Sequence, residues 1–500
     1  MQQALRPHAV VIGSGVGGLA AAARLAAQGM KVTVLEKLDA LGGRAYVYHQ
    51  DGFTFDAGPT IITAPYIFEN LWRDCGYTLS DDVTLKPCDP FYKIRFDDGS
   101  VFSYCGDTEK MREEVRKFEP KDVAAYDRFI EASEKIFDVA FTQLADKPFH
   151  SLIFTARMLV GLVKLQGYRT VFAKVSDYFT DPKLKIVFSF HPLLIGGNPF
   201  TTTAYYCLIA HLERTFGVHY AVGGTGALVN GIASLITRNG GTIRTNAEVA
   251  KILTEGRQVR GVELADGETI AADLVVSNAD PAMTYGSLLK DHPRRRWSDR
   301  KIKRSRFSMS LFVWYFGTNR KFEDVGHHTM VLGPRYKGLL KDIFIKHKQA
   351  EDFSLYLHRP TASDPDLAPE GRDTFYVLSP VPHLASGVDW PSFAEAYRQK
   401  IEARLEETLM PGLKDAIVTS RMLTPLDFKE RLNSYLGAAF SMEPQLLQSA
   451  WFRPHNKSEE VDGLYLVGAG THPGAGLPGV ASSAKLVSDL VAQDGVFQRP

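Results

Sequence analysis

The first hydrophobic run of the chain, at residues 10–12, leads directly into a glycine-rich turn. An alanine-rich stretch follows over residues 19–27, and a second apolar run occupies residues 31–35 after Gly29. Short apolar runs bounded by glycine are typical of buried strands, whereas a continuous alanine-rich stretch is typical of a packed helix. The pattern therefore predicts a strand, a helix and a second strand.

The turn before this helix has the spacing G-x-G-x-x-G at Gly13, Gly15 and Gly18, with Gly17 between them. Glycine here permits a tight turn, lets the backbone approach a pyrophosphate and lets the helix pack on the sheet. The helix N-terminus then offers unpaired N–H groups to the phosphates. Glu36 ends the second strand, at the spacing of a ribose-hydroxyl acceptor. An ordinary glycine-rich βα turn leaves Glu36 unexplained, so we predict a dinucleotide-binding unit.

Hydrophobic periodicity assigns the rest of the chain to sheets and helices. Alternating positions predict a hairpin over residues 90–104, and three- and four-residue spacing predicts helix over residues 108–145. Buried-strand patterns at residues 274–279 and 463–468 predict strands that return to the first sheet, so the nucleotide-binding domain is expected to be discontinuous.

One helical segment, residues 151–166, is apolar around nearly its whole circumference, with Arg157, Gly161 and Lys164 on one narrow stripe. It is too short to span a bilayer. A buried helix with snorkelling ends is one interpretation, and a helix at the membrane interface is our hypothesis. The basic run at residues 290–306 is typical of a solvated face, with a membrane surface as the minority interpretation.

Composition narrows the class of protein. The 500 residues are 45% hydrophobic and 23% charged, with a formal net charge of +1, so we expect a globular protein of two or three units and no nucleic-acid partner. The four cysteines show neither C-x-x-C pairing nor neighbouring histidines, and we expect no metal site. No segment reads as a signal peptide or spanning helix, so we expect a cytoplasmic protein with at most peripheral membrane contact.

Two further glycine-rich turns specify the dinucleotide. Gly42 and Gly43 precede Arg44, a combination that suits a loop in contact with an anionic ligand. Residues 468–479 form a second turn before a C-terminal helix, whose N-terminus could stabilise negative charge on a reduced flavin. Together they favour FAD over NAD. His191 is the one acid–base candidate, although a lone histidine is more often structural.

The motifs at residues 42–46, 55–60, 196–200, 450–456 and 465–474 occur in an order that resembles the bacterial and fungal-type phytoene desaturases, within the FAD-dependent amine oxidase-like superfamily. The resemblance implies non-covalent FAD, with the first glycines at the pyrophosphate, Glu36 on the ribose and Val249 on the adenine through its backbone. The cofactor-binding residues that we predict are Gly13, Gly15, Gly17, Gly18, Glu36, Lys37, Gly43, Arg44, Gly58, Pro59, Thr60, Val249, Gly470, Pro478, Gly479 and Val480.

The resemblance also implies an α/β fold of three parts. These are a discontinuous Rossmann-like FAD-binding domain (1–75, 219–290 and 455–495), an inserted mixed β-sheet substrate domain (76–105 and 291–454) and a helical subdomain (106–218) that contacts the membrane through residues 148–175.

The implied reaction is desaturation of phytoene, a C40 polyene, to more conjugated carotenoids, with lycopene as the expected product and oxygen or a quinone as electron acceptor. We expect hydride transfer from an allylic carbon to flavin N5 with loss of a neighbouring proton, and we assign no catalytic base. A flavin-dependent carotenoid isomerase or another carotenoid-modifying oxidase is the alternative within the fold. The alternative that is not an enzyme is a carrier of the same fold, which binds an isoprenoid without reacting with it.

Overall fold

The computed structural model describes residues 6–142, 161, 163 and 165–495. Most of the predicted membrane-contact helix, including Arg157 and Lys164, lies outside the described residues. The hypothesis of an interfacial helix at residues 151–166 therefore stays a prediction.

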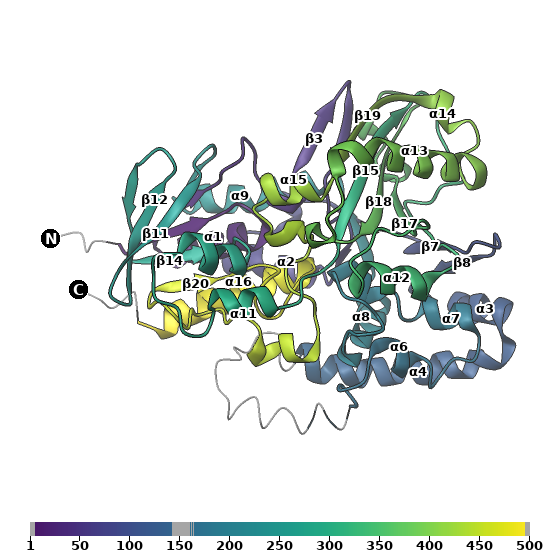
Figure 1. Ribbon diagram of the computed structural model, residues 1–500, viewed down its shortest axis with the longest axis horizontal. Coiled ribbons are helices and arrows are strands. Elements are labelled where there is room, and N and C mark those ends of the chain that lie inside the picture. Colours follow the sequence, from purple (N-terminus) through teal and green to yellow (C-terminus); the bar gives the residue numbers. More distant parts are fainter. Residues whose placement is uncertain (1–5, 143–160, 162, 164, 496–500) are drawn as a thin grey trace.

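A five-stranded parallel sheet forms one half of the molecule (Figure 1). Its strands, in spatial order, are β10 (Thr242–Arg244), β2 (Lys31–Leu35), β1 (His8–Ile12), β14 (Leu274–Ser277) and β20 (Leu464–Leu466). The three helices α1 (Val16–Ala27), α9 (Thr225–Arg238) and α16 (Leu477–Gln493) pack together beside it. The predicted strand–helix–strand unit (β1, α1 and β2) and the two later strands of the same sheet (β14 and β20) are confirmed. These strands lie far apart in the sequence but side by side in the sheet.

A seven-stranded mixed sheet forms the other half. In spatial order it contains β19 (Ile417–Leu423), β15 (Ser310–Thr318), β18 (Asp373–Val381), β17 (Leu355–His358), β16 (His328–Val331), β7 (Tyr92–Arg95) and β8 (Val101–Tyr104). All pairs are antiparallel except β16 with β7. The predicted hairpin at residues 90–104 is the pair β7 and β8.

The second strand of this sheet, β15, is buried along its whole length. Phe312, Trp314 and Phe316 face a cluster that includes residues of α13 (Trp390–Thr408). Leu311 and Tyr315, on the opposite face, belong to the main core. Successive side chains of a strand point to opposite faces of the sheet. The face with Phe312, Trp314 and Phe316 packs on α13, and the face with Leu311 is the one that can line a site.

Helices cluster below the seven-stranded sheet in Figure 1: α3 (Thr108–Phe118), α4 (Val123–Phe137), α6 (Val171–Val175), α7 (Pro182–Val187) and α8 (Leu208–Phe216). The helical prediction for residues 108–145 is confirmed over the described residues 108–142, where the helical stretch is divided into α3 and α4. Glu119 adopts an extended conformation and Pro120 follows it, which ends α3 before α4 begins. The residue before a proline is disfavoured in the helical region, which explains the break.

Smaller elements complete the chain. The remaining strands are β3 (Val47–Gln50), β4 (Phe53–Asp56), β5 (Ile62–Thr63), β6 (Leu85–Pro87), β9 (Val218–Ala221), β11 (Val249–Glu255), β12 (Gln258–Leu264) and β13 (Thr269–Ala271). The remaining α-helices are α2 (Tyr66–Asp74), α10 (Pro281–Met283), α11 (Asp299–Arg304), α12 (Tyr336–Phe344), α14 (Leu413–Ala416) and α15 (Pro425–Glu430). Among the described residues, no helix combines the length and apolar character needed to cross a membrane.

Candidate functional site: a cavity that joins the two sheets

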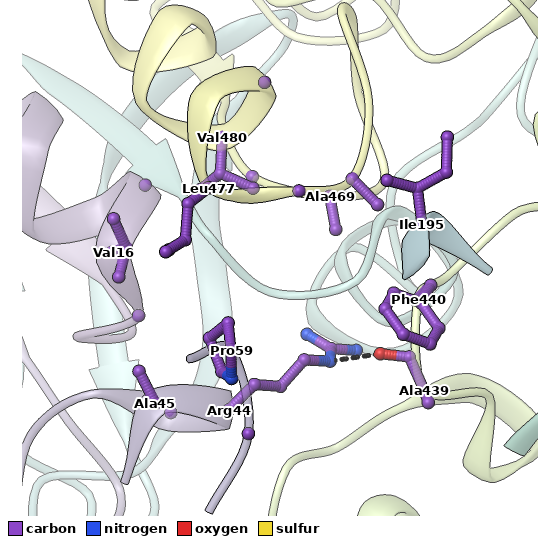
Figure 2. A pocket seen from close by; sticks show the side chains of 18 of the residues that line it. Val16, Arg44, Ala45, Pro59, Ile195, Ala439, Phe440, Ala469, Leu477 and Val480 are labelled. Carbon is purple, nitrogen blue, oxygen red and sulfur yellow. Dashed lines mark hydrogen bonds between the residues drawn. The ribbon is translucent and has the colours of Figure 1, made fainter. Parts of the chain in front are cut away.

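A single cavity of about 620 Å³ extends from the glycine turn after β1 to the open face of the seven-stranded sheet. Figure 2 shows the end of the cavity at the glycine turn, where Val16 and Ala45 face Leu477 and Val480 across the space. Ile195 and Phe440 lie at the other side of this view. The cavity therefore runs between segments from the beginning, middle and end of the chain.

The glycine turn brings α1 unusually close to the sheet. A Cβ atom on Gly18 would lie 2.1 Å from the backbone oxygen of Gly13, a distance that no side chain can occupy. A Cβ on Gly17 would lie 2.8 Å from Oδ1 of Asn278, the residue that follows β14. Since no side chain among the described residues caps the N-terminus of α1, its first N–H groups can meet an anion at the cavity.

Glu36 is buried at the end of β2 and lines the cavity. Its Oε2 accepts hydrogen bonds from the backbone N–H of Ser14 at 2.8 Å and from the Ser14 hydroxyl at 2.6 Å, and its Oε1 accepts from the N–H of Leu38 at 2.9 Å. These bonds fix both oxygens beside the glycine turn. Ser14 was missed in the sequence because it occupies an unspecified position of the motif.

Arg44 also lines the cavity, and its guanidinium points across the pocket toward Ala439 in Figure 2. Nε donates to the Ala439 oxygen at 2.6 Å, and Nη2 donates to the hydroxyl of Ser434 at 2.9 Å. Burial lowers the pKa of this guanidinium, and the nearby carboxylate of Asp280 opposes that shift. A half-buried cation that faces a cavity favours an anionic ligand.

The segment before β5 connects the nucleotide end to the seven-stranded sheet. Tyr376 of β18 donates to the Gly58 oxygen at 3.0 Å, and its hydroxyl lies 2.9 Å from Oγ1 of Thr60. Tyr315 of β15 donates to the Ala57 oxygen at 2.8 Å. The predicted residues Gly58, Pro59 and Thr60 are thus held at the junction of the two halves, where all three line the cavity.

The second glycine-rich turn lies against the same cavity. The helix α16 begins at Leu477, with Pro478 in its first turn and no capping side chain among the described residues. Arg453, which is 2% exposed, holds the preceding loop through bonds to the oxygens of Ala469 at 2.7 Å and Thr471 at 3.1 Å. The cavity therefore receives the N-termini of two helices, α1 and α16.

The predicted cofactor residues assemble at one place, with two exceptions. Those that line the cavity are Gly13, Gly15, Gly17, Glu36, Lys37, Gly43, Arg44, Gly58, Pro59, Thr60, Val249, Pro478, Gly479 and Val480. Gly18 and Gly470 lie behind the lining: Gly18 packs on the backbone of Gly13, and a Cβ on Gly470 would lie 2.2 Å from Cδ of Pro281. Their contribution is close packing, and a direct ligand contact for them stays a prediction.

The acid–base candidate, His191, lies behind the cavity wall. Its Nε2 is 3.2 Å from Oε2 of Glu213, whose Oε1 accepts a hydrogen bond from the hydroxyl of Tyr92 at 2.6 Å. All three side chains are buried, and Glu213 is the one that lines the cavity. His191 therefore orients a buried carboxylate, and any catalytic part it plays stays a prediction.

One cluster of cysteine and histidine side chains forms only in the folded chain and could not be predicted from the sequence. Cys88 Sγ lies 3.9 Å from Nε2 of His328, and one ligand atom each from Cys88, His327 and His328 lie within 4.8 Å of one another. Other contacts already engage these rings: Nδ1 of His328 meets the Tyr356 hydroxyl at 2.7 Å, and Nε2 of His327 meets Nε2 of His358 at 3.1 Å. Nδ1 of His327 also lies 2.7 Å from the hydroxyl of Ser363. Because every ring nitrogen of His327 and His328 has a polar contact, the cluster is a hydrogen-bonded part of the core.

The far part of the cavity is lined by apolar side chains. The seven-stranded sheet and the helical region supply Phe190, Leu193, Leu194, Leu208, Ile209, Leu212, Met309, Leu311, Met330, Leu332, Leu355, Leu378 and Leu423. Glu213 of α8, beside Leu212, also lines the cavity, but its carboxylate is already engaged by Tyr92 and His191. The wall therefore suits an uncharged apolar molecule whose binding comes from burial of its surface.

The fold and this cavity agree with the comparisons to known proteins. The chain belongs to the flavin containing amine oxidoreductase family, which matches residues 16–492. Its relatives place it, more narrowly, among the bacterial-type phytoene desaturases. A putrescine oxidase variant of solved structure shares the fold, with a TM-score of 0.66 at 14% identity over 99% of this chain and 100% of that one.

Two relatives illustrate the similarity. A neurosporene-forming phytoene desaturase of Cereibacter sphaeroides is 51% identical over 97% of this chain and 94% of its own length. A lycopene-forming phytoene desaturase of Pantoea ananas is 47% identical over 97% of this chain and 99% of its own length. The resemblance seen in the sequence motifs is confirmed.

Membership of a flavin-containing family implies FAD, and the residues present fit that cofactor. Because Gly17 and Gly18 carry no Cβ, a ligand can approach the backbone of the turn closely. The N-termini of α1 and α16, which have no capping side chain, also face the cavity. A buried carboxylate, Glu36, and a half-buried cation, Arg44, add the polar groups that a nucleotide needs.

Proposed function

We propose that this chain desaturates phytoene in carotenoid biosynthesis, with FAD as its bound cofactor. The observation that carries the proposal is the continuity of one cavity, which has nucleotide-binding features at one end and an apolar wall at the other. The relatives named above, phytoene desaturases by their own descriptions, support the same substrate.

The residues predicted to hold FAD have separate tasks. The N–H groups at the start of α1 would bind the pyrophosphate, Glu36 the ribose and the Val249 backbone the adenine. Arg44 would contribute a positive charge near the phosphates, and the N-terminus of α16 would face the isoalloxazine. When bound, FAD supplies the acceptor for the hydride removed from an allylic carbon.

The chain itself would bind, orient and shield the polyene. Leu311, Met330 and Leu378, from three strands of the seven-stranded sheet, would hold the chain of the substrate against the sheet. Burial there excludes water from the reacting carbons. The remaining proton leaves a carbon next to a delocalised cation, where it is already acidic, so we assign no residue as its obligatory acceptor.

The product is the property on which the relatives differ, since some form neurosporene and others lycopene. Our sequence-based prediction is lycopene. Chromatography of the pigments formed from phytoene by the FAD-loaded protein tests both parts of the proposal. A longer conjugated polyene supports desaturation, whereas a geometric isomer with the same number of double bonds would identify a carotenoid isomerase.

The membrane contact at residues 148–175 and the electron acceptor belong to the same proposal. An anaerobic assay with an added quinone, compared with an aerobic assay without it, assigns the acceptor. A purified protein that is colourless and binds phytoene without changing it would instead identify an isoprenoid carrier.

A further inference from the structure

Polar aromatic side chains lie on the cavity face of the seven-stranded sheet, within a largely apolar wall. Met330 of β16 pairs with Tyr356 of β17, which pairs in turn with Leu378 of β18, and all three line the cavity. The next pair of the same face is His328 with His358. Because alternate residues of a strand share a face, these two histidines lie on the side of the sheet that meets a ligand.

The hydroxyl of Tyr356 is hydrogen-bonded to His328. It lies 2.7 Å from Nδ1 of His328 and 3.3 Å from Oγ1 of Thr60. Oγ1 of Thr60 also lies 2.9 Å from the hydroxyl of Tyr376, which donates its own proton to the Gly58 oxygen. Thr60 therefore donates its single proton to Tyr376. The proton of Tyr356 then has its shorter contact with Nδ1 of His328, and we assign it there.

Further contacts lead from His328 toward the surface. Nε2 of His328 lies 3.9 Å from Sγ of Cys88. One ring nitrogen each of His327 and His328 lie within 4.8 Å of each other and of this sulfur. Nδ1 of His327 lies 2.7 Å from the hydroxyl of Ser363, which is half-buried and follows the exposed Ala362. These contacts connect the cavity wall to an outer loop of the molecule.

His328 is held as a neutral imidazole. Burial lowers its pKa well below the ordinary value of 6.5, and the neighbouring His327 adds to that shift. Burial also raises the pKa of the Cys88 thiol to about 12, so Cys88 keeps its proton. The lone pair of a neutral imidazole can accept a proton, and burial disfavours the imidazolium, so that the proton is passed on readily.

Each double bond that desaturation forms releases one proton, so this inference rests on the proposed function. The apolar wall excludes water from the reacting carbons, and the proton therefore needs a route through groups of the protein. We propose that Tyr356 and His328 form a relay that carries this proton out of the cavity. Tyr356 would meet the substrate, and His328 would act through Tyr356.

The proton leaves after the hydride has carried two electrons from the substrate to the cofactor. A C–H bond beside the resulting allylic cation breaks, and its electron pair becomes the second bond of the new alkene. The proton binds the oxygen of Tyr356 while the original phenol proton moves to Nδ1 of His328. The step yields a neutral alkene, an unchanged Tyr356 and a protonated His328, which passes its extra proton toward His327 and Ser363.

Glu213 is the other candidate acceptor in this part of the wall. Its two oxygens are engaged by the Tyr92 hydroxyl at 2.6 Å and by Nε2 of His191 at 3.2 Å. Both partners are themselves buried. The contacts of Tyr356, in contrast, continue to the half-buried Ser363, and we therefore assign the relay to Tyr356 and His328.

Tyr356→Phe removes the phenol proton and keeps the ring in the cavity wall. The matched control is Tyr397→Phe, because the Tyr397 hydroxyl is also buried and lies 2.7 Å from Oγ of Ser379, among residues that pack on the opposite face of the sheet. Circular dichroism and the flavin spectrum show that each variant is folded and loaded with FAD.

Anaerobic single turnovers with phytoene measure the rise of polyene absorbance. Tyr356→Phe should form the polyene about a hundredfold more slowly, at the low end of acid–base effects, because the proton is acidic and can still pass slowly to water. The dissociation constants of FAD and phytoene should not change. The wild-type reaction should be slower in D₂O, since the transferred proton of Tyr356 is then a deuteron, and Tyr356→Phe should lose this dependence. Tyr397→Phe should react like the wild type.

The relay also predicts the protonation state of one imidazole, which can be measured without turnover. Nitrogen NMR of the FAD-loaded protein with ¹⁵N-labelled histidine should show Nδ1 of His328 as an unprotonated hydrogen-bond acceptor. His328→Gln identifies the signal by its loss, and Tyr356→Phe should shift it.

Four results would overturn the relay and leave desaturation in place: a wild-type rate in folded Tyr356→Phe, an equal loss in Tyr397→Phe, the same D₂O effect in Tyr356→Phe as in the wild type, or a proton on Nδ1 of His328 in the resting protein. A wild-type protein that forms no longer polyene from phytoene would refute the proposed function, and the relay with it.

Discussion

The carboxylate of Glu36 and the residue between the first two glycines of the turn, Ser14, are joined by two hydrogen bonds of 2.8 and 2.6 Å to the same oxygen. They lie 22 positions apart in the sequence, and the segment between them includes the whole of α1. The pair thus closes the strand–helix–strand unit on itself. It also fixes the carboxylate in the cavity before any ligand arrives.

Glu36→Ala should weaken FAD binding. A hydrogen bond to a charged group contributes about 1.5 to 3 kcal/mol, so the dissociation constant should rise roughly ten- to a hundredfold. Titration of the apoprotein with FAD, followed by flavin fluorescence, measures this change. Glu248→Ala is the control, because Glu248 lines the same cavity but is about half exposed. Equal losses in the two variants would contradict the assignment of Glu36 to the ribose.

Arg44→Lys should weaken FAD binding although it keeps the charge. The lysine ammonium cannot reproduce the guanidinium geometry that joins Ala439 and Ser434. We expect a dissociation constant about tenfold higher and a flavin that dissociates faster in stopped-flow experiments. Wild-type affinity in the lysine variant would show that charge alone is sufficient.

Gly18→Ala should destabilise the nucleotide-binding half. The added Cβ would meet the Gly13 oxygen at 2.1 Å, so α1 must move away from the sheet. Overpacking of this kind costs about 1 to 3 kcal/mol, which should lower the thermal midpoint by several degrees. Gly286→Ala is a suitable comparison, since its Cβ would come no closer than 3.9 Å to the side chain of Ile302. Similar midpoints for both variants would argue against the tight packing described here.

Deprotonation of Glu443 should lower the free energy of unfolding of the protein as the pH rises. Burial raises the pKa of this carboxyl to about 7, above its ordinary value of 4.5. Between these two values the folded state binds more protons than the unfolded state, so the free energy of unfolding falls as the pH increases through this range. The change due to this group is about 3 kcal/mol at most.

Thermal unfolding of Glu443→Gln across pH 4.5 to 8 checks this prediction. The amide does not titrate, so the variant should show a flatter dependence and should be more stable than the wild type above pH 7. A wild-type slope that persists in the variant would place the effect on another group.

Local patterns predicted much of the fold, because they depend on residues close together in the chain. The turn at Gly13, Gly15 and Gly18, the second strand and the hairpin at residues 90–104 were all predictable in this way. The break at Pro120 was also accessible, since proline disfavours helix in the residue before it. The three- and four-residue apolar spacing continues on both sides of Pro120, so this spacing predicted helix across it.

Long-range contacts were beyond the sequence patterns. Asn278 packs against the glycines of the turn, yet it lies 260 positions after Gly18 in the sequence. Arg453 was part of a recognised motif, but the oxygens of Ala469 and Thr471 that it holds are defined only by the folded loop. The contact between Cys88 and His328 could not be predicted either, because no sequence pattern around one residue points to the other.

The central claim is that one cavity holds FAD and a polyene together. Anaerobic mixing of the FAD-loaded protein with phytoene in a stopped-flow spectrophotometer tests it most directly. We predict that the oxidised-flavin absorbance near 450 nm decays while the absorbance of a longer conjugated polyene rises. A flavin that stays oxidised while bound phytoene is recovered unchanged would contradict it.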